Sequence, residues 1–246
     1  MAIAAPALAD RMSSANALLS AYPGFLNRIE GGQLVWKDGT RMPLDDGQGR
    51  KSLERMLDKP DIEDMFSMAY PKGRAGTPPA PGRDPGRVRY APLFDKMYGN
   101  CREGRAAAKL ITVDWLPSHG GGKLKFTAVN GAAGQLRKVS AALDRLPGRF
   151  AGFLTPSAGT YNCRPIAGTA RTSAHGWGIA IDINPKRAHY WRWTKPDSRG
   201  RYPWRNAIPA EIVDVFEQHG FIWGGKWYHY DTMHFEFRPE LVTPIK

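Results

Sequence analysis

Four side chains in the C-terminal half have the types and spacing of a hydrolytic metal site. His175 lies seven residues before Asp182, and Asp231 lies three residues before His234. Two histidines and one carboxylate can hold a zinc ion with one coordination position open, which is the arrangement of catalytic rather than structural zinc sites. A further carboxylate is then needed to take a proton from the attacking water. Asp231 is the nearest candidate in the sequence, so the pattern predicts metal-assisted hydrolysis.

The first of two strands predicted to position these residues spans residues 177–184. Its isoleucines share one face, and small residues flank Asp182 on the other face. An acidic side chain in such an apolar strand is costly to bury unless it is paired or bound to a metal. His175 precedes the strand at an odd separation, which would point it to the opposite face. Gly176 and Gly178 allow a turn or bulge that redirects it.

The second predicted strand, residues 233–237, carries His234. Alternation places Phe235 and Phe237 on one face and His234 with Glu236 on the other. We therefore expect Glu236 to lie beside the metal ligands, where its carboxylate can orient one of them.

The remaining pattern predicts an α+β fold with a largely antiparallel sheet, because the strands are not separated by regular helices. No glycine-rich phosphate-binding motif follows a strand. Helices are predicted over residues 11–21, 53–66 with an interruption at Pro60, 132–146 and 209–219, and strands over a hairpin at 33–43, then 110–115, 124–129 and 150–155.

Composition limits the possible classes of protein. The 246 residues are 42% hydrophobic and 11% aromatic, which excludes a disordered chain and suffices for one large domain. No stretch approaches the roughly 18 uninterrupted apolar residues of a membrane span. The formal net charge of +12 suggests an acidic partner, and nucleic acid, anionic lipid and an anionic cell-wall polymer all satisfy it.

A basic segment rich in proline and glycine, residues 71–87, separates two predicted parts of the chain. Residues 1–87 form an N-terminal extension with a hairpin and short helices, and residues 88–246 form the compact domain that carries the candidate metal site. We expect the basic segment to be exposed, to assist attachment to the acidic partner and to take no part in chemistry. We predict that Arg74, Arg83 and Arg87 of this segment are exposed and assist attachment.

The two cysteines and the N-terminus bear on the compartment. Cys101 and Cys163 form either one disulfide, which implies an oxidising compartment, or two buried free thiols, and alone they cannot make a structural zinc site. Residues 7–9, Ala-Leu-Ala, resemble the end of a secretory signal, but no basic region precedes them. A leader remnant and a plain N-terminal arm are both open.

Two motifs resemble those of the M15 metallopeptidases, which include VanY-type D-alanyl-D-alanine carboxypeptidases and phage L-alanyl-D-glutamate endolysins. Residues 173–182 read S-x-H-x-x-G-x-A-x-D, and residues 231–236 read D-x-x-H-F-E. Residues 223–227, WGGKW, also look like that group, and the resemblance covers roughly residues 137–239. It implies the hedgehog/D,D-peptidase fold, a small α+β domain with a central antiparallel sheet and flanking helices.

The resemblance also implies roles for individual residues. One Zn²⁺ per chain would be held by His175, Asp182 and His234. Asp231 would be the general base, where several relatives have the longer glutamate.

Further residues are implied to act in catalysis or substrate binding. Arg164 is expected to stabilise the oxyanion or to grip a substrate carboxylate, with Arg171 as the alternative. Ser173 fits the first motif or caps a turn. His229 either lines the cleft or is exposed, and Trp223 belongs to the segment before the second motif.

The implied function is that of an exported hydrolase, periplasmic or associated with the cell wall, whose partners are peptidoglycan or muropeptides. The bond cleaved stays open among D-Ala-D-Ala, L-Ala-D-Glu and cross-links between stem peptides, as do carboxypeptidase or endopeptidase activity and the oligomeric state. One alternative is a catalytically inactive, metal-stabilised cell-wall-binding domain, against which the carboxylate of Asp231 argues. Another is a nonspecific nucleic-acid binder, suggested by the charge, although no motif for specific nucleic-acid recognition is found.

Overall fold

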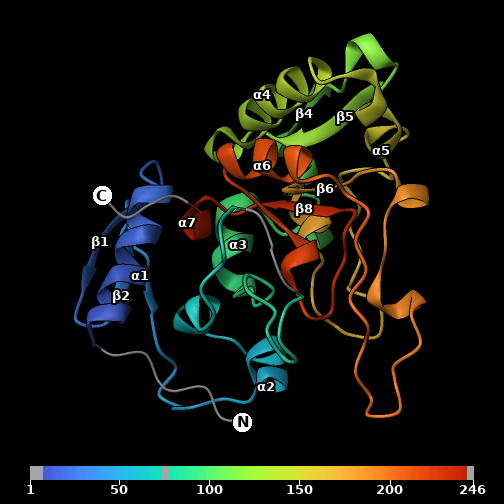
Figure 1. The fold of residues 1–246 in the computed structure, drawn as a ribbon. Coiled ribbons are helices and arrows are strands. Elements are labelled where there is room, and N and C mark those ends of the chain that lie inside the picture. Colours follow the sequence, from blue (N-terminus) through green and yellow to red (C-terminus); the bar gives the residue numbers. More distant parts are fainter. Residues whose placement is uncertain (1–7, 74–77, 243–246) are drawn as a thin grey trace.

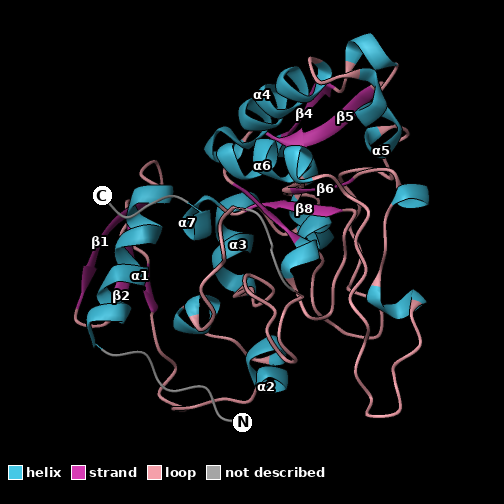
Figure 2. Cartoon of the chain, in the orientation of Figure 1, coloured by secondary structure: helices cyan, strands magenta, loops and turns pink. Residues whose placement is uncertain are grey.

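Three small antiparallel sheets and several helices form an α+β structure, which a computed structural model describes over residues 8–73 and 78–242 (Figures 1 and 2). The sheets consist of β1 (Leu26–Glu30), β2 (Gln33–Trp36) and β3 (Arg41–Pro43); β4 (Leu110–Asp114) and β5 (Lys123–Thr127); and β6 (Ala180–Asp182), β8 (His234–Phe237) and β7 (Phe221–Trp223). The α-helices are α1 (Leu8–Ala21), α2 (Leu53–Asp58), α3 (Ala91–Tyr98), α4 (Ala132–Asp144), α5 (Ala151–Leu154), α6 (Ala210–Gln218) and α7 (Pro239–Val242). The predicted α+β class is thereby confirmed.

The sheet β6-β8-β7 lies between the N-terminal elements and the layer formed by α4, β4 and β5 (Figure 1). Its antiparallel register pairs Asp182 of β6 directly with His234 of β8, and Ala180 with Glu236. Directly opposed residues project from the same face, so the register alone brings Asp182 and His234 together. On the other face, the ring of Phe235 stacks on Phe216 of α6 with a centroid distance of 3.8 Å.

One hydrophobic core runs from α1 to β8. It includes Leu18 of α1, Tyr22 directly after that helix, Trp36 of β2 and Phe235 of β8. The hydroxyl of the buried Tyr22 donates to Glu240 of α7 at 2.6 Å. The described part of the N-terminal segment therefore shares one hydrophobic core with the strands that carry the candidate ligands.

Most of the predicted elements are confirmed, with shorter bounds. The hairpin, the helices at 132–146 and 209–219 and the strands at 110–115 and 124–129 all form. The predicted strand at 150–155 is wrong, because Ala151–Leu154 is the helix α5. Phe150 and Leu154 are both buried at a spacing of four residues, and periodicity cannot distinguish a strand from one helical turn in so short an apolar run.

The segment 71–87 is irregular, as expected, but its second half is not an exposed loop. Asp84 is fully buried, and Pro85 and Gly86 are buried beside it. Gly86 has a φ of +82°, and a Cβ there would lie 2.6 Å from Cδ1 of Ile222, so only glycine fits. The expectation of exposure is wrong for residues 84–86, because the chain turns inward there to pack on β7, whereas Arg83 is exposed as expected.

Two other expectations fall at the edges of what the structure describes. Arg74 lies outside the described residues, as does Ala7 of the signal-like sequence. Within the described ranges, no helix has both the length and the apolar character needed to cross a membrane.

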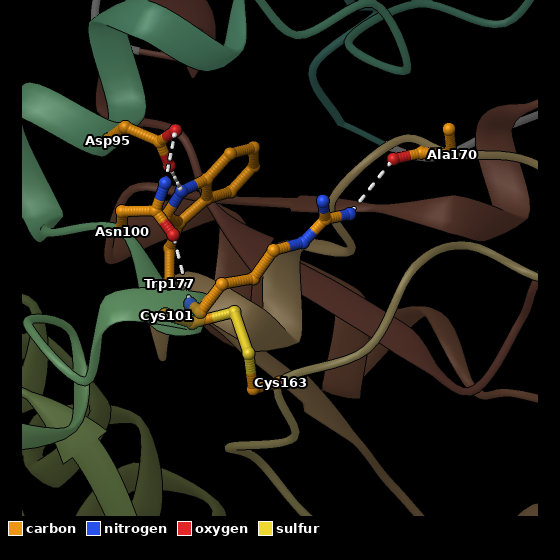
Figure 3. Close-up of a disulfide and its surroundings, with 7 residues drawn as sticks. Asp95, Asn100, Cys101, Cys163, Ala170 and Trp177 are labelled. Atoms are coloured by element: carbon orange, nitrogen blue, oxygen red, sulfur yellow. Dashed lines mark hydrogen bonds between the residues drawn. A yellow bond between two sulfur atoms is a disulfide. The ribbon is translucent and has the colours of Figure 1, made fainter.

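A disulfide joins Cys101 to Cys163 and ties the end of α3 to the loop before the first motif (Figure 3). Two neighbouring hydrogen bonds support the same connection. Nη2 of Arg102 donates to the carbonyl of Ala170 at 3.2 Å, and Nε1 of Trp177 donates to Asp95 of α3 at 2.7 Å. The predicted disulfide is therefore formed, and it anchors the segment that leads to His175.

Reduction of this disulfide is expected to lower the free energy of unfolding by about 4 kcal/mol, because the two cysteines close a loop of 62 residues. Denaturant unfolding of the wild type and of the Cys101→Ser/Cys163→Ser variant measures the difference. Titration of the unfolded, non-reduced protein with a maleimide provides the control, and two reactive thiols there would contradict the pairing.

Candidate metal centre

The side chains of His175, Asp182 and His234 converge, with their ligand atoms all within 4.8 Å of one another. Nδ1 of His234 lies 3.0 Å from Oδ1 of Asp182, and Nε2 of His175 lies 3.2 Å from Oδ2. The two imidazole nitrogens are 3.3 Å apart. The structure thus brings together the three ligands that the sequence predicted.

A short helical turn, Ala174–Trp177, redirects His175 toward β6 as predicted. The turn ends at Gly178, which has a φ of +68° and whose N–H donates to the carbonyl of His175 at 3.1 Å. This φ strains any residue other than glycine, and a Cβ at position 178 would lie 2.5 Å from Cδ2 of Leu110 and would displace that side chain. Ser173 occupies the position before the turn, without a capping bond from its side chain.

The orientation of each imidazole ring is fixed by the oxygen that lies beside its outward nitrogen, the one facing away from the other candidate ligands. Nδ1 of His175 lies 2.5 Å from the carbonyl of Thr160, which selects the tautomer that leaves Nε2 free to bind. Nε2 of His234 lies 3.4 Å from Glu236, so its Nδ1 faces Asp182. Metal-binding histidines usually have such an oxygen partner on the second nitrogen.

The charges of the three side chains are strongly coupled. Burial tends to raise the pKa of Asp182, but the adjacent His175 and His234 outweigh it and hold that pKa well below its usual range. Burial tends to lower the pKa of His234, but hydrogen bonds to Asp182 and Glu236 raise it to about 9. The acidic side chains around His234 therefore favour positive charge at this position.

Asp231 lies beside the ligands with an oxygen that no described residue satisfies. Its Oδ1 is buried and lacks a hydrogen-bond partner among the residues that the structure describes. Burial and the nearby charge of Asp182 raise its pKa to about 7. An unpaired buried carboxylate oxygen is costly, and its place next to candidate ligands indicates a functional role.

The segment before Asp231 approaches it closely. The N–H of Asp231 donates to the carbonyl of Gly224 at 3.0 Å, and a Cβ at Gly224 would lie 2.5 Å from the carbonyl oxygen of Asp231. Trp223 is buried, and its Nε1 donates to the carbonyl of Thr232 at 2.9 Å. Trp223 therefore braces the turn that carries Asp231 and does not line the cleft.

Glu236 is fully buried and belongs to an ionic network that reaches the N-terminal segment. Arg89 binds its carboxylate with two nitrogens, with Nε 2.7 Å from Oε1, and Nη1 of Arg238 lies 3.3 Å from Oε1. Burial tends to raise the pKa of Glu236, but the charge and hydrogen bonds of Arg89 hold it well below its usual range. Glu236 therefore stays ionised against His234, as expected for a residue that orients a ligand.

Replacing Glu236 by glutamine is expected to weaken metal binding by about 10–100-fold, because His234 loses its ionised partner. Competition with a chromogenic chelator measures the change in affinity. Glu240→Gln is the matched control, since Glu240 binds Arg238 and Tyr22 of the same network but not His234. Equal metal affinity in the Glu236→Gln variant and the wild type would exclude the orienting role.

The predicted arginines fall in two adjacent cavities. Arg164 is exposed and lines the cleft that contains the three ligands and Asp231. Arg171 lines a neighbouring cavity, where it lies 3.5 Å from Asp58. Ser173 and His229 also line the metal cleft.

The cleft-lining residues Arg87, Arg89 and Tyr190 were missed by the sequence analysis, as was Asp84, which holds Arg87 and His229. The buried carboxylate of Asp84 accepts from the N–H of His229 at 2.9 Å and from Nη1 of Arg87 at 3.1 Å, and lies 2.7 Å from Nδ1 of His229. The segment 71–87 was expected to take no part in the chemistry, yet its Arg87 lines the metal cleft. The sequence signal for these contacts was a single aspartate, Asp84, in a basic segment. Burial of its carboxylate requires partners of this kind.

A second acidic cluster, Asp45, Asp46 and Asp61, is not a comparable site. The buried ammonium group of Lys51 lies 2.8 Å from both Asp46 and Asp61, and 2.7 Å from Asp64. A cation of the chain itself therefore already lies among these carboxylates.

Comparison with known proteins supports an M15 family peptidase. Residues 167–237 match the family model described as D-alanyl-D-alanine carboxypeptidase. The matched range carries His175, Asp182, Asp231 and His234, whereas Arg164 and the cleft residues of the N-terminal segment precede it. No curated protein and no solved structure gives a significant match.

Proposed function

We propose that this M15-type chain is an exported zinc peptidase that hydrolyses the stem peptides of peptidoglycan. The observation that carries the proposal is the convergence of two histidines and one aspartate beside Asp231, whose buried Oδ1 has no partner among the described residues. A binding domain would have no need to retain that carboxyl group, since its burial lowers stability.

The side chains present fit a zinc ion. Two imidazoles and one carboxylate are zinc ligands of a common catalytic type, and both histidines already have oxygen partners on their outward nitrogens. When bound, zinc supplies Lewis acidity toward the scissile carbonyl and makes water a stronger acid. His175, Asp182 and His234 would hold it, at one ion per chain.

Asp231 is the proposed general base. A carboxyl with a pKa of about 7 is half-ionised near neutral pH, and the positive charge of a cation beside it would favour its ionised form. Its carboxylate would take the proton of the attacking water and then pass it to the departing amine.

Arginine side chains of the cleft would bind the negative charges of substrate and transition state. Arg164 is exposed there, and among the described residues its guanidinium makes one long hydrogen bond, 3.5 Å to the carbonyl of Pro165. Its guanidinium is therefore available for an oxyanion or a peptide carboxylate. Arg87 lines the same cleft, where Asp84 holds it, and could bind the same negative charge of the substrate or transition state.

The wider setting agrees with export. The Cys101–Cys163 disulfide forms most readily in an oxidising compartment, which supports a periplasmic or cell-wall location. The antiparallel order β6-β8-β7 with flanking helices is compatible with the hedgehog/D,D-peptidase fold that the family resemblance implies. We assign the peptidase domain to residues 88–246, with residues 1–87 supplying Asp84 and Arg87 to its cleft.

Incubation of the zinc-loaded protein with purified muropeptides tests the proposal. The masses of the products distinguish release of a terminal D-alanine from cleavage after L-alanine and from opening of a cross-link. Products in any of these classes, abolished by a chelator and restored by zinc, are the expected result. Intact muropeptides of every class would contradict the proposal.

A further inference from the structure

Residues 185–207, here called the aromatic–basic loop, concentrate positive charge on one exposed segment. Seven basic residues and one acidic residue give this loop +6 of the chain's net charge of +12. The acidic residue, Asp197, already pairs with Arg201 at 3.0 Å. All seven basic residues are exposed: Lys186, Arg187, Arg192, Lys195, Arg199, Arg201 and Arg205.

Aromatic rings are interleaved with these charges. Trp193 is 61% exposed and packs edge-on against Tyr190, with a centroid distance of 5.7 Å. Behind it, Trp191 contacts Tyr202 at 4.8 Å and His229 at 4.7 Å. Trp, Tyr and Arg are the residue types enriched where proteins bind partners. The loop thus presents the ring of Trp193 to solvent, and the other aromatic rings of the loop pack against one another.

The loop begins directly beside the candidate metal centre. Tyr190 lines the metal cleft, and its backbone pairs with that of Asp231. The N–H of Trp191 donates to the carbonyl of Tyr230 at 2.9 Å. In Figure 1 the loop, coloured orange, extends away from the central sheet. A polymer bound along it would therefore reach the cleft at Tyr190.

Internal contacts hold the loop in shape. Asp197 accepts from the N–H groups of Arg199 and Arg201, both at 2.9 Å, and the hydroxyls of Thr194 and Tyr230 are 2.6 Å apart. A surface that is already ordered loses less conformational entropy when it binds.

We propose that the aromatic–basic loop binds the peptidoglycan polymer itself, with a sugar ring of the glycan against Trp193 and carboxylates of neighbouring stem peptides on the arginines. This inference rests on the proposed function, because a peptidase beside the loop requires a polymer that carries peptides. The loop holds the insoluble polymer while one attached peptide enters the cleft. It takes the attachment role that the sequence assigned to residues 71–87, whose Asp84 and Arg87 the structure places at the cleft.

Co-sedimentation of the metal-free protein with insoluble peptidoglycan tests the loop separately from turnover. Trp193→Ala and the triple variant Lys195→Glu/Arg199→Glu/Arg205→Glu are each expected to weaken binding by about tenfold or more, a loss of roughly 1.4 kcal/mol. The effect of the triple variant should be largest at low salt, where screening is weak. Matched controls elsewhere on the surface, expected to bind as the wild type does, are Ile111→Ala and Lys37→Glu/Lys138→Glu/Arg145→Glu.

Hydrolysis of a small soluble muropeptide by the zinc-loaded loop variants should be unchanged. Wild-type binding by both loop variants would overturn the inference, even if the muropeptide assay supports a peptidase. The inference would also be overturned if the loop variants lost binding to duplex DNA but kept binding to peptidoglycan, since the loop would then be a nucleic-acid-binding surface. Failure of hydrolysis with loop-dependent binding intact would instead count against the peptidase proposal alone.

Discussion

Replacing either His175 or His234 by alanine is expected to remove zinc from the protein and to abolish hydrolysis. Each side chain would supply one of three ligand atoms, and a carboxylate with one imidazole is a weak zinc site. The wild type should retain about one zinc per chain after loading and dialysis, measured by elemental analysis. Each variant should retain little, with activity at the level of the chelated enzyme.

His119→Ala is the matched control, because His119 lies at the turn between β4 and β5, away from the ligands. It should keep both zinc and activity. A wild-type protein that holds no stoichiometric metal after loading would refute the ligand assignment. Full zinc retention by both His175→Ala and His234→Ala would refute it equally.

Each candidate ligand could be read from the sequence because the pattern around it is local. Asp182 and His234 each lie on a strand whose alternation is visible, and a glycine at 178 signals the turn that redirects His175. The contacts of Asp84 and Arg89 could not be read in the same way. Asp84 meets His229 across 145 positions and Arg89 meets Glu236 across 147, and no periodicity connects such distant residues.

Local patterns also failed where two alternative conformations of a segment would bury the same residues. Phe150 and Leu154 are buried on one helical turn, but the same apolar run would serve a short strand. The segment 71–87 has the composition of a surface loop, yet Gly86 packs against Ile222 and carries the chain past the cleft. In both places tertiary packing decides the structure, because the composition of a few residues does not specify what they pack against.

Asp231→Asn is expected to keep zinc and to lose hydrolysis by about 10²–10⁴-fold, the usual effect of removing a general base. Asparagine has nearly the same shape as aspartate but cannot accept the proton of the attacking water. Zinc content and kcat on a soluble muropeptide measure the two effects. Asp114→Asn is the matched control, since Asp114 is exposed and pairs only with Lys123 in the described contacts.

The same variant distinguishes a catalytic from a structural role for this carboxyl group. Burial and the charge of Asp182 raise the pKa of Asp231, so its ionised form lowers the stability of the metal-free fold. Neutral asparagine removes that repulsion, and the metal-free variant should therefore unfold at the wild-type temperature or above it near pH 8. A structural carboxylate would give lower stability with activity preserved. Near-native turnover in Asp231→Asn would exclude Asp231 as the base, whatever its effect on the unfolding temperature.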